Sequence, residues 1–432
     1  MDRAAGGNGG REMSENRELA IIVGLQLPEY GFMDVDESLL ELKALAHTAG
    51  AMVADQVIQA RESPDVATYV GRGKLEEIRN LLGHYGAELV IFDDELTPAQ
   101  LRNIEEALGA KVIDRTQLIL DIFAQRARTR EAQLQVDLAQ LQYLLPRLAG
   151  RGTTLSRLGG GIGTRGPGET KLETDRRRIR QRIANLRREI EEIRAQRGLH
   201  RHARRKNLVP VAALVGYTNA GKSTLLNRLT GAGVLVEDQL FATLDPTIRR
   251  WEMPPSGQPV LFVDTVGFIR KLPHTLVAAF RATLEEVMSA DLLIHVVDAT
   301  AYNMESQMSA VFEVLEELGC AGRPLITVFN KVDDLSRRAA ISELLAQTPD
   351  SIGMSALTGA GMDGFIDLLE QKLGERLTYG IYEIPYKHAG IASAMREVGQ
   401  VIEEEYTDTG IRLEAGLPDS SAERWAQFRV LS

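Results

Sequence analysis

The residues in this sequence with the plainest chemistry form a glycine-rich loop between an apolar run and a helix-like segment. The loop occupies residues 216–223, directly after the apolar run 211–215. Glycines at this spacing let backbone N–H groups turn toward phosphate oxygens, and the helix that follows directs its positive end at the same charge. Lys222 can reach the β- and γ-phosphates of a nucleotide, and the Ser223 hydroxyl can bind Mg²⁺. The pattern predicts a phosphate-binding loop, whose candidate contacts are Gly216, Tyr217, Thr218, Asn219, Ala220, Gly221, Lys222 and Ser223.

Three further motifs each follow an apolar run. They are Asp264, Thr265, Val266 and Gly267 after the run 259–263, then Asn330, Lys331, Val332 and Asp333 after 325–329, and Ser355, Ala356 and Leu357 after 351–354. The first motif offers a carboxylate that can hold Mg²⁺ through water and a glycine N–H that can contact the γ-phosphate and sense its loss.

The second and third of these motifs can recognise a guanine base. A carboxylate beside an asparagine accepts from the N1–H and the exocyclic amine of guanine, and adenine lacks that arrangement. The backbone N–H groups of the third motif can bind the guanine O6. Four motifs in this order predict a GTPase, and Asn330 and Asp333 disfavour a P-loop kinase.

A switch segment is expected between the phosphate loop and Asp264. It consists of Phe241, Ala242, Thr243, Leu244 and Asp245, followed by Pro246 and Thr247. A threonine from such a segment completes the Mg²⁺ shell when GTP is bound, and the two threonines are both candidates. Loss of the γ-phosphate would release the segment. We expect Lys222, Gly267 and the switch threonine to carry the hydrolysis chemistry.

Two positions bear on how fast that chemistry runs. Phe268 stands where many GTPases have a glutamine that orients the attacking water, and phenylalanine cannot do this. We therefore expect slow intrinsic hydrolysis unless a partner or another group positions the water. Asn219 suggests a K⁺ ion beside the phosphates, because related GTPases with asparagine at this position can bind one. A hydrogen bond that stiffens the loop is the alternative role for Asn219.

The charge is unevenly distributed along the chain. The 432 residues have a formal net charge of −10, yet residues 126–206 hold 21 Lys and Arg against 8 Asp and Glu. A basic block inside an acidic protein predicts a polyanionic partner, and arginines within a glycine-rich stretch suit RNA phosphates. A solvated helical hairpin with an arginine-rich face is the alternative. The candidate RNA contacts are Arg151, Arg157, Arg165, Lys171, Arg176, Arg177 and Arg178.

The order of apolar and helical segments predicts an α/β protein of four parts after a disordered tail at 1–17. We expect an N-terminal α/β domain at 18–125, and then a basic helical hairpin with a glycine-rich tip and linker at 126–207. A GTPase domain with a parallel-rich sheet should occupy 208–375, and a small α+β domain 376–432. Residues 116–148 should be strongly helical, and 393–406 should form the helix of the last domain.

The composition indicates the cellular compartment in which the protein is expected to work. The single cysteine, Cys320, permits no intrachain disulfide and fits a reducing cytosol. The longest apolar runs, such as 292–297, are too short to span a bilayer. The seven histidines show no metal-ligand spacing. We expect a cytoplasmic monomer without a membrane span.

The chain resembles the HflX family, translation-factor-related P-loop GTPases close to the Obg and Era groups. The resemblance covers nearly the whole chain and lies in GYTNAGKST at 216–224, QLFATLDPT at 239–247, DTVGFI at 264–269, NKVD at 330–333 and LGGGIGTRGPGETKLETDRR at 158–177. It implies that Ser223 and Thr243 are Mg²⁺ ligands, with Thr243 preferred to Thr247 on this ground. Some members are said to bind ATP through the N-terminal domain, although no second complete phosphate loop occurs in this sequence.

The resemblance also implies a function. Family members bind the large (50S) ribosomal subunit, with the glycine-rich tip directed toward the peptidyl transferase region. They split 70S ribosomes into subunits, particularly under stress, and the ribosome stimulates their GTP hydrolysis. Two alternatives stay open. One is a GTP-dependent assembly factor or RNA-binding checkpoint protein for immature large subunits, and the other is a GTPase of metabolism or regulation without an RNA partner.

Overall fold

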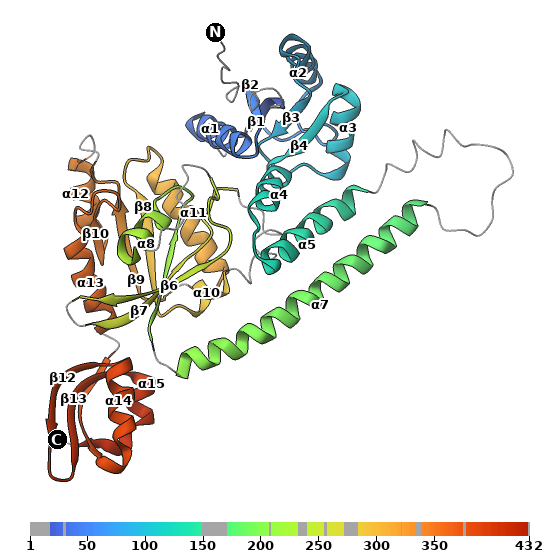
Figure 1. Ribbon diagram of the computed structural model, residues 1–432. Coiled ribbons are helices and arrows are strands. Elements are labelled where there is room, and N and C mark those ends of the chain that lie inside the picture. Colours follow the sequence, from blue (N-terminus) through green and yellow to red (C-terminus); the bar gives the residue numbers. More distant parts are fainter. Residues whose placement is uncertain are drawn as a thin grey trace, which may run out of the picture. The chain divides into compact units, whose positions relative to one another are not determined.

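The computed structural model describes residues 18–28, 32–148, 171–206, 209–231, 240–254, 257–271, 284–320, 322–333, 338–374 and 377–430 (Figure 1). The chain divides into two compact units. The first contains Met1–Gln125 and Gln133–Arg187, and the second contains Arg126–Ala132 and Arg188–Ser432. The predicted tail at 1–17 and the tip arginines Arg151, Arg157 and Arg165 lie outside the described residues. None of the helices that the structure describes is long and apolar enough to cross a membrane.

The N-terminal domain is a four-stranded parallel sheet with helices on both faces. Its strand order is β2-β1-β3-β4. Helices α2 and α3 pack their apolar residues against one face, and α1 covers the other, where Leu39 packs on Gly24. The segment Gly71 to Lys74 is the start of α2, with Gly71 as its N-cap. The elements are β1 (Leu19–Gln26), α1 (Phe32–Thr48), β2 (Met52–Ala60), α2 (Arg72–Tyr85), β3 (Leu89–Phe92), α3 (Pro98–Leu108), β4 (Lys111–Asp114) and α4 (Arg115–Arg126).

The prediction that residues 116–148 are strongly helical is confirmed for most of the segment, but the chain breaks at 127–129 between two helices. After α4 ends at Arg126, α5 runs over Arg130–Arg147. The break is stabilised by Thr129, whose hydroxyl accepts a hydrogen bond from the N–H of Ala132 at 3.2 Å and so caps the new helix. Helix propensity alone does not reveal the break, since the surrounding residues are good helix formers.

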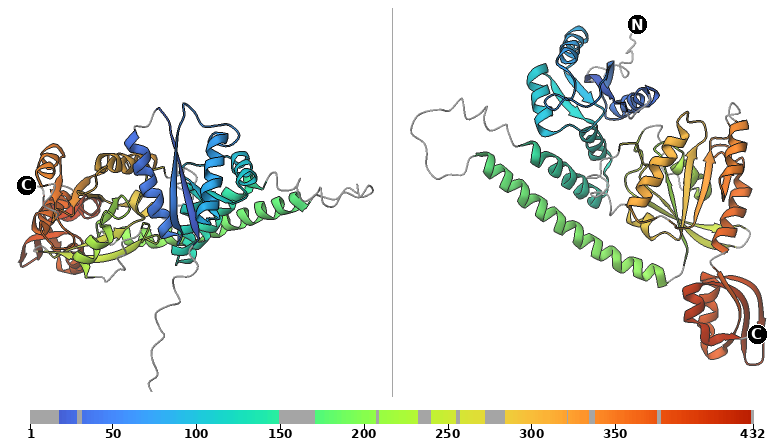
Figure 2. Two further views of the ribbon diagram at one scale, coloured as in Figure 1. Left: turned by 90° about the horizontal axis from the view of Figure 1, so that it is seen from above. Right: turned by 180° about the vertical axis from the view of Figure 1, so that it is seen from behind.

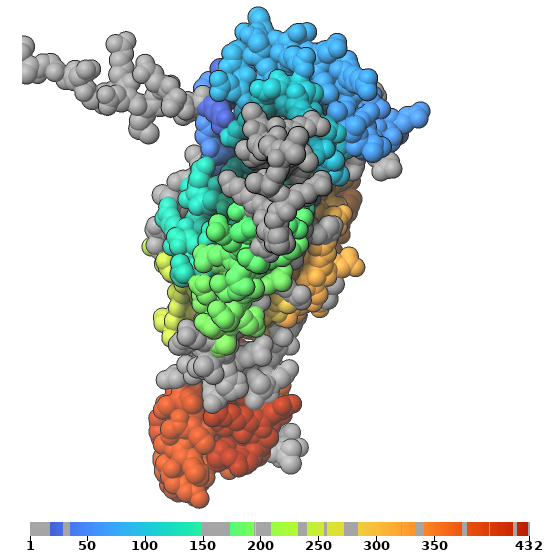
Figure 3. Space-filling model, turned by 90° about the vertical axis from the view of Figure 1, so that its right-hand side faces the viewer, coloured from blue at the N-terminus to red at the C-terminus, as the bar shows by residue number. Residues whose placement is uncertain are grey.

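Helix α7 (Lys171–Lys206) carries most of the Lys and Arg residues of the basic block at 126–206. Its 36 residues include fourteen Lys and Arg against five Asp and Glu. Ile183, Leu186 and Ile190 are buried at spacings of three and four, which gives the helix one apolar stripe. Six arginines of its described part are exposed, namely Arg177, Arg178, Arg180, Arg182, Arg187 and Arg188. Part of the surface of α7 is seen in green in Figure 3.

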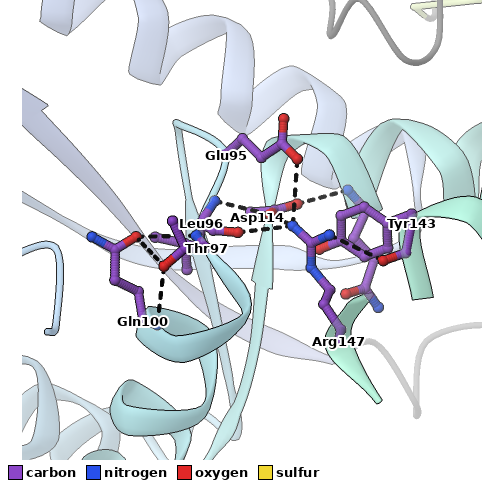
Figure 4. A network of polar contacts seen from close by, with 8 residues as sticks. Glu95, Leu96, Thr97, Gln100, Asp114, Tyr143 and Arg147 are labelled. Atoms are coloured by element: carbon purple, nitrogen blue, oxygen red, sulfur yellow. Dashed lines mark hydrogen bonds and ion pairs between the residues drawn. The ribbon is translucent and has the colours of Figure 1, made fainter. Parts of the chain in front are cut away.

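Arg147, the last residue of α5, ties this helix to the carboxyl edge of the N-terminal sheet (Figure 4). Its Nη2 donates to the carbonyl of Leu96 at 2.8 Å and lies 3.2 Å from Oδ2 of Asp114. The ring of Tyr143 lies 3.4 Å from the guanidinium carbon, a cation–π contact. Asp114 is fully buried and also accepts the N–H groups of Leu96 and Gln117.

The segment 211–353, where a GTPase domain is predicted, contains a six-stranded sheet of order β10-β9-β8-β5-β7-β6. Five strands are parallel, as the apolar runs predict. The sixth, β6, was not predicted and runs antiparallel to β7 at the sheet edge. The strands are β5 (Val211–Gly216), β6 (Thr247–Met253), β7 (Gln258–Asp264), β8 (Leu292–Asp298), β9 (Leu325–Asn330) and β10 (Ser351–Gly353).

Helices cover both faces of this sheet, as the two views of Figure 2 show. One core contains the apolar residues of α8 and α13 together with Ile294 and Val296 of β8. On the opposite face, Val297 packs with residues of α11 and α12. The helices are α8 (Lys222–Thr230), α10 (Glu285–Ser289), α11 (Met304–Glu317), α12 (Arg338–Gln347) and α13 (Met362–Gly374).

The C-terminal domain is a four-stranded antiparallel sheet, of order β12-β13-β11-β14, packed on α14. The predicted helix at 393–406 is wrong in its second half. Helix α14 ends before Gly399, whose backbone is extended, and 400–406 forms the edge strand β12 with a bulge at Ile402. The elements are β11 (Leu377–Pro385), α14 (Ala389–Val398), β12 (Gln400–Tyr406), β13 (Gly410–Pro418), α15 (Asp419–Arg424) and β14 (Arg429–Val430).

Replacing Asp114 should destabilise the N-terminal domain strongly. Asp114→Ala removes the acceptor of two backbone N–H groups and leaves Arg147 without its buried carboxylate, so we expect a loss of about 3–5 kcal/mol. Hydrogen exchange at the amides of β3 and β4 measures this loss as faster opening. Glu18→Ala is the control, because it removes an exposed pair with Lys111, at 3.3 Å, and should cost less than about 1 kcal/mol. Equal effects of the two changes would contradict the anchoring role of Asp114.

Candidate nucleotide-binding site

The glycine-rich loop joins the end of β5 to the start of α8, and neither of its two glycines has room for a side chain. Gly216 has φ +150°, and a Cβ on it would lie 2.2 Å from the carbonyl oxygen of Val296. Gly221 has φ +98°, and a Cβ there would lie 2.1 Å from Nδ2 of Asn330. These close approaches explain why the loop needs glycine at both positions.

Lys222 is buried at the first turn of α8. Its Nζ donates to the carbonyl oxygens of Gly216 and Tyr217, at 3.0 and 2.8 Å, so the ammonium group is held beneath the loop. Burial lowers the pKa of Lys222 to about 8, and the charge of Asp264 acts in the opposite direction.

Three oxygen-bearing side chains converge beside this lysine. The Ser223 hydroxyl donates to Oδ2 of Asp264 at 2.6 Å, and the Thr243 hydroxyl donates to the same oxygen at 3.2 Å. The two hydroxyl oxygens lie 3.0 Å apart. Burial raises the pKa of Asp264, while Lys222 and the two hydroxyls lower it. The structure therefore brings Thr243, rather than Thr247, to the two other predicted Mg²⁺-associated groups.

The donor set fits a magnesium ion. Mg²⁺ prefers oxygen ligands and keeps several waters, and it is bound through few protein groups plus substrate phosphates. Oδ1 of Asp264 is buried and has no hydrogen-bond partner among the described residues, which leaves an acceptor for a bound cation or its water. Within the described part of the chain, no three His, Cys, Asp or Glu side chains gather to hold a metal alone. A Mg²⁺ ion would therefore rely on Ser223, Thr243 and the nucleotide.

The residues after Asp264 are tied to the phosphate loop through backbone hydrogen bonds. The N–H of Phe268 donates to Gly216 at 3.1 Å, and its carbonyl accepts from Thr218 at 2.8 Å. The Phe268 side chain is 1% exposed, so it faces the core and not the nucleotide pocket. A Cβ on Gly267 would lie 2.8 Å from the Cα of Thr218. Sequence reasoning missed one further tie, the hydroxyl of Tyr217 accepting the N–H of Arg270 at 2.7 Å.

Asn330 joins the phosphate loop to the second base-reading motif. Its Nδ2 donates to the carbonyl of Ala220 at 2.8 Å, and its Oδ1 accepts the N–H of Ala356 at 2.9 Å. Lys331, at φ +66°, pairs with Asp298 at 2.6 Å, a carboxylate that sequence reasoning overlooked although it ends the apolar run of β8. Asp333 is exposed.

The remaining predicted residues fall into lining and framework groups. Leu244 and Val266 are buried, and the hydroxyl of Thr265 donates to Leu214 at 2.6 Å. Ser355 is buried and its hydroxyl accepts the N–H of Thr358, whereas Leu357 is exposed. The residues lining the pocket are Thr218, Asn219, Gly221, Lys222, Ser223, Thr224, Phe241, Ala242, Thr243, Thr265 and Gly267.

Comparison with known proteins establishes the family. Three family models match consecutive parts of the chain. They are described as GTP-binding GTPase N-terminal at 36–124, GTP-binding GTPase middle region at 126–204, and 50S ribosome-binding GTPase at 211–331. A GTPase HflX from Lacrimispora saccharolytica is 50% identical over 407 residues, which are 94% of this chain and 95% of the relative. The chain belongs to the HflX family of GTPases.

Other HflX relatives match over a similar span. The GTPase HflX of Caldanaerobacter subterraneus is 48% identical, with 97% of this chain and 95% of the relative covered. That of Escherichia coli is 44% identical, with 93% and 94% covered. A solved structure of a GTP-binding protein from Sulfolobus solfataricus in complex with GDP is 28% identical, covers 83% of this chain and 99% of that chain, and has a TM-score of 0.42. Membership of the HflX family confirms the predicted GTPase class, while the individual nucleotide contacts stay predictions.

A methyl group at Gly221 should abolish tight nucleotide binding. Gly221→Ala adds a Cβ into Asn330 at a left-handed backbone position, and we expect an affinity for a fluorescent GDP analogue at least about 30-fold weaker, or ~2 kcal/mol. Gly231→Ala at the other end of α8 is the matched control. Gly231 also has a left-handed backbone, with φ +62°, but a Cβ there has nothing within 4 Å. Unchanged binding by Gly221→Ala would show that the loop does not depend on this close approach.

Proposed function

We propose that this chain is a GTPase that binds the large ribosomal subunit and dissociates 70S ribosomes into subunits, acting as a monomer in the cytoplasm during stress. The observation that carries the ribosomal part is the exposed arginine face of α7, in a chain whose residues 211–331 match a model described as a 50S ribosome-binding GTPase. A helix with fourteen basic residues against five acidic ones is suited to binding a polyphosphate backbone.

In this proposal the nucleotide chemistry is divided among three elements. Lys222 binds the β- and γ-phosphates, and the N–H of Gly267 detects the γ-phosphate. Ser223 and Thr243 hold Mg²⁺, which when bound neutralises charge on the phosphates. Phe268 is buried in the core, so the attacking water must be oriented by another group. Stimulation by the ribosome would follow if the large subunit supplies or orders that group.

A K⁺ ion beside Asn219 is one candidate for extra charge stabilisation. Asn219 lines the pocket and holds a left-handed backbone at φ +61°. If the ion contributes, GTP turnover in K⁺ buffer should exceed turnover in Na⁺ buffer at equal ionic strength. Equal rates in the two buffers would leave Asn219 with a role in loop stiffness alone.

The guanine base is assigned to Asn330, Asp333 and the backbone of 355–357. Because both ends of the Asn330 amide are already used to join two loops, its main contribution is to fix the loops around the base. The exposed carboxylate of Asp333 is left to discriminate between bases. This division of roles predicts that specificity for guanine depends on Asp333, whereas the fixed arrangement of the two loops depends on Asn330.

The alternative function is that of a GTP-dependent large-subunit assembly factor or RNA-binding checkpoint protein. It uses the same switch and the same arginines but acts on immature particles. Sucrose gradients of mature 70S ribosomes, mixed with the protein and a non-hydrolysable GTP analogue, separate the two functions. Conversion of the 70S peak to subunits supports splitting, and an intact 70S peak supports the assembly function.

Exchanging the base-reading carboxylate should change nucleotide preference. Asp333→Asn replaces an acceptor of N1–H and amine protons by an amide, which can donate to the O2 of xanthine. We expect the affinity for GDP to fall about 30-fold or more and the affinity for xanthosine diphosphate to rise, since hydrogen bonds to charged groups contribute about 1.5–3 kcal/mol each. Competition with a fluorescent nucleotide measures both. Asp363→Asn, at the exposed start of α13, is the control and should change neither affinity.

Reversing charge on α7 should weaken binding to the large subunit. The double change Arg177→Glu and Arg178→Glu should lower affinity for purified 50S subunits and reduce the salt slope of binding by about 2. The matched control reverses the charges of Arg249 and Arg250, two consecutive exposed arginines on strand β6. Sedimentation at 50–200 mM KCl gives both quantities. Equal losses in the two variants would point to general electrostatics and not to a face of α7.

Deleting residues 151–168 should abolish splitting while nucleotide binding persists.

A further inference from the structure

The switch segment is bound at its far end to the start of helix α5. Asp245 lies two residues after Thr243, and its Oδ2 accepts the N–H groups of Arg128 and Thr129, both at 3.1 Å. Its other oxygen accepts the hydroxyl of Thr129. The partners are 116 and 117 residues away in sequence, so these are not the bonds of a local turn. Asp245 does not line the nucleotide pocket.

The three donors stand at the point where the chain turns into α5. Thr129 precedes Arg130, the first residue of the helix, and its hydroxyl oxygen also accepts from Ala132 at 3.2 Å. The N-terminal turn of a helix carries unsatisfied N–H groups and a positive dipole end, and both favour a nearby carboxylate. Arg126–Ala132 belongs to the same compact unit as the switch segment, whereas the rest of α5 belongs to the other.

The link between Asp245 and the Mg²⁺-associated groups is short and firmly packed. Leu244, between Thr243 and Asp245, is 2% exposed, and Phe241 at the beginning of the segment is likewise 2% exposed. Pro246 follows and restricts the backbone further. Because only the buried Leu244 separates the two residues, a movement of Asp245 away from Arg128 and Thr129 would also displace Thr243.

We propose that Asp245 is a positioning residue for the nucleotide switch. Held by the start of α5, it keeps the Thr243 hydroxyl beside Ser223 and Asp264, and the nucleotide state of the pocket thereby acts on the first turn of α5. The inference rests on the proposed role of Thr243 as a Mg²⁺ ligand. Coupling of this kind is reciprocal, so whatever moves the start of α5 also alters the affinity for GTP.

The chain contains a matched control for this carboxylate. Asp65 in the N-terminal domain accepts the N–H groups of Ala67 and Thr68 and the hydroxyl of Thr68, the same set of donors. Those partners are two and three residues away, and none belongs to the nucleotide site. Asp65→Ala therefore removes the same kind of interaction without touching the switch.

The test compares Asp245→Ala with Asp65→Ala in the full chain. The first readout is the affinity for a non-hydrolysable GTP analogue and for GDP, each at saturating Mg²⁺. The second is hydrogen exchange at the amides of 128–132 in both complexes. For Asp245→Ala we expect a loss of about tenfold in GTP-analogue affinity with GDP affinity preserved. The difference in exchange between the two complexes should also disappear. Asp65→Ala should change neither readout. Preserved GDP affinity also shows that the variant is folded.

A second pair of variants tests whether the contact itself is responsible. Thr129→Val removes the hydroxyl that Asp245 binds, and combining it with Asp245→Ala should add little to either single change. Thr129→Ser should behave as the unmodified chain. Additive losses would overturn the proposal, and so would an Asp245→Ala variant that matches Asp65→Ala. Ser223→Ala separates this result from failure of the proposed site, because it should abolish the Mg²⁺ dependence of GTP-analogue binding whatever Asp245 does.

Discussion

The buried carboxylate of Asp264 is the constraint around which the candidate nucleotide-binding site is built. A charge taken out of water is costly unless other groups compensate it, and Asp264 is fully buried at the end of β7. The compensating groups come from separate elements. Lys222 and Ser223 begin α8, and Thr243 belongs to the switch segment. Compensating this one carboxylate thus requires the phosphate loop, the switch segment and strand β7 to meet at the carboxyl edge of the sheet. At the same edge, Asn330 joins the phosphate loop to the loop that contains Ala356.

Much of the fold could be predicted because its strands are buried on both faces. Such strands read as continuous apolar runs, and five of the six strands of the central sheet were found in this way. The elements that escaped are those whose pattern is weak. Strand β6 lies at an edge and exposes Arg249 and Arg250, and β12 is rich in glutamate, which favours helix in isolation. The break before α5 depends on a cap at Thr129 and on Asp245, a partner far away in the sequence, so no local window contains it.

The site was predictable where residue type dictates chemistry and unpredictable where only packing does. A lysine and a serine after a glycine-rich loop can be recognised in the sequence, and so can an aspartate that follows a buried strand. The structural contacts that a side chain makes with distant residues cannot be recognised in this way. Asn330 joins two loops, Tyr217 holds the N–H of Arg270, and Phe268 turns into the core, and each depends on residues brought together by the sheet. Asp245 is the clearest case, because its motif position suggests a nucleotide contact while its carboxylate binds the N–H groups before α5.

The edge strand β12 of the C-terminal sheet is poorly suited to pairing with a β-strand of another molecule. Edge strands present open N–H and C=O groups and are common starting points for aggregation, which natural proteins limit with charges, bulges and brevity. Strand β12 has three consecutive glutamates, at 403–405, and a bulge beside them, and the opposite edge, β14, is only two residues long. These features limit pairing between the edges of this sheet and strands of other molecules.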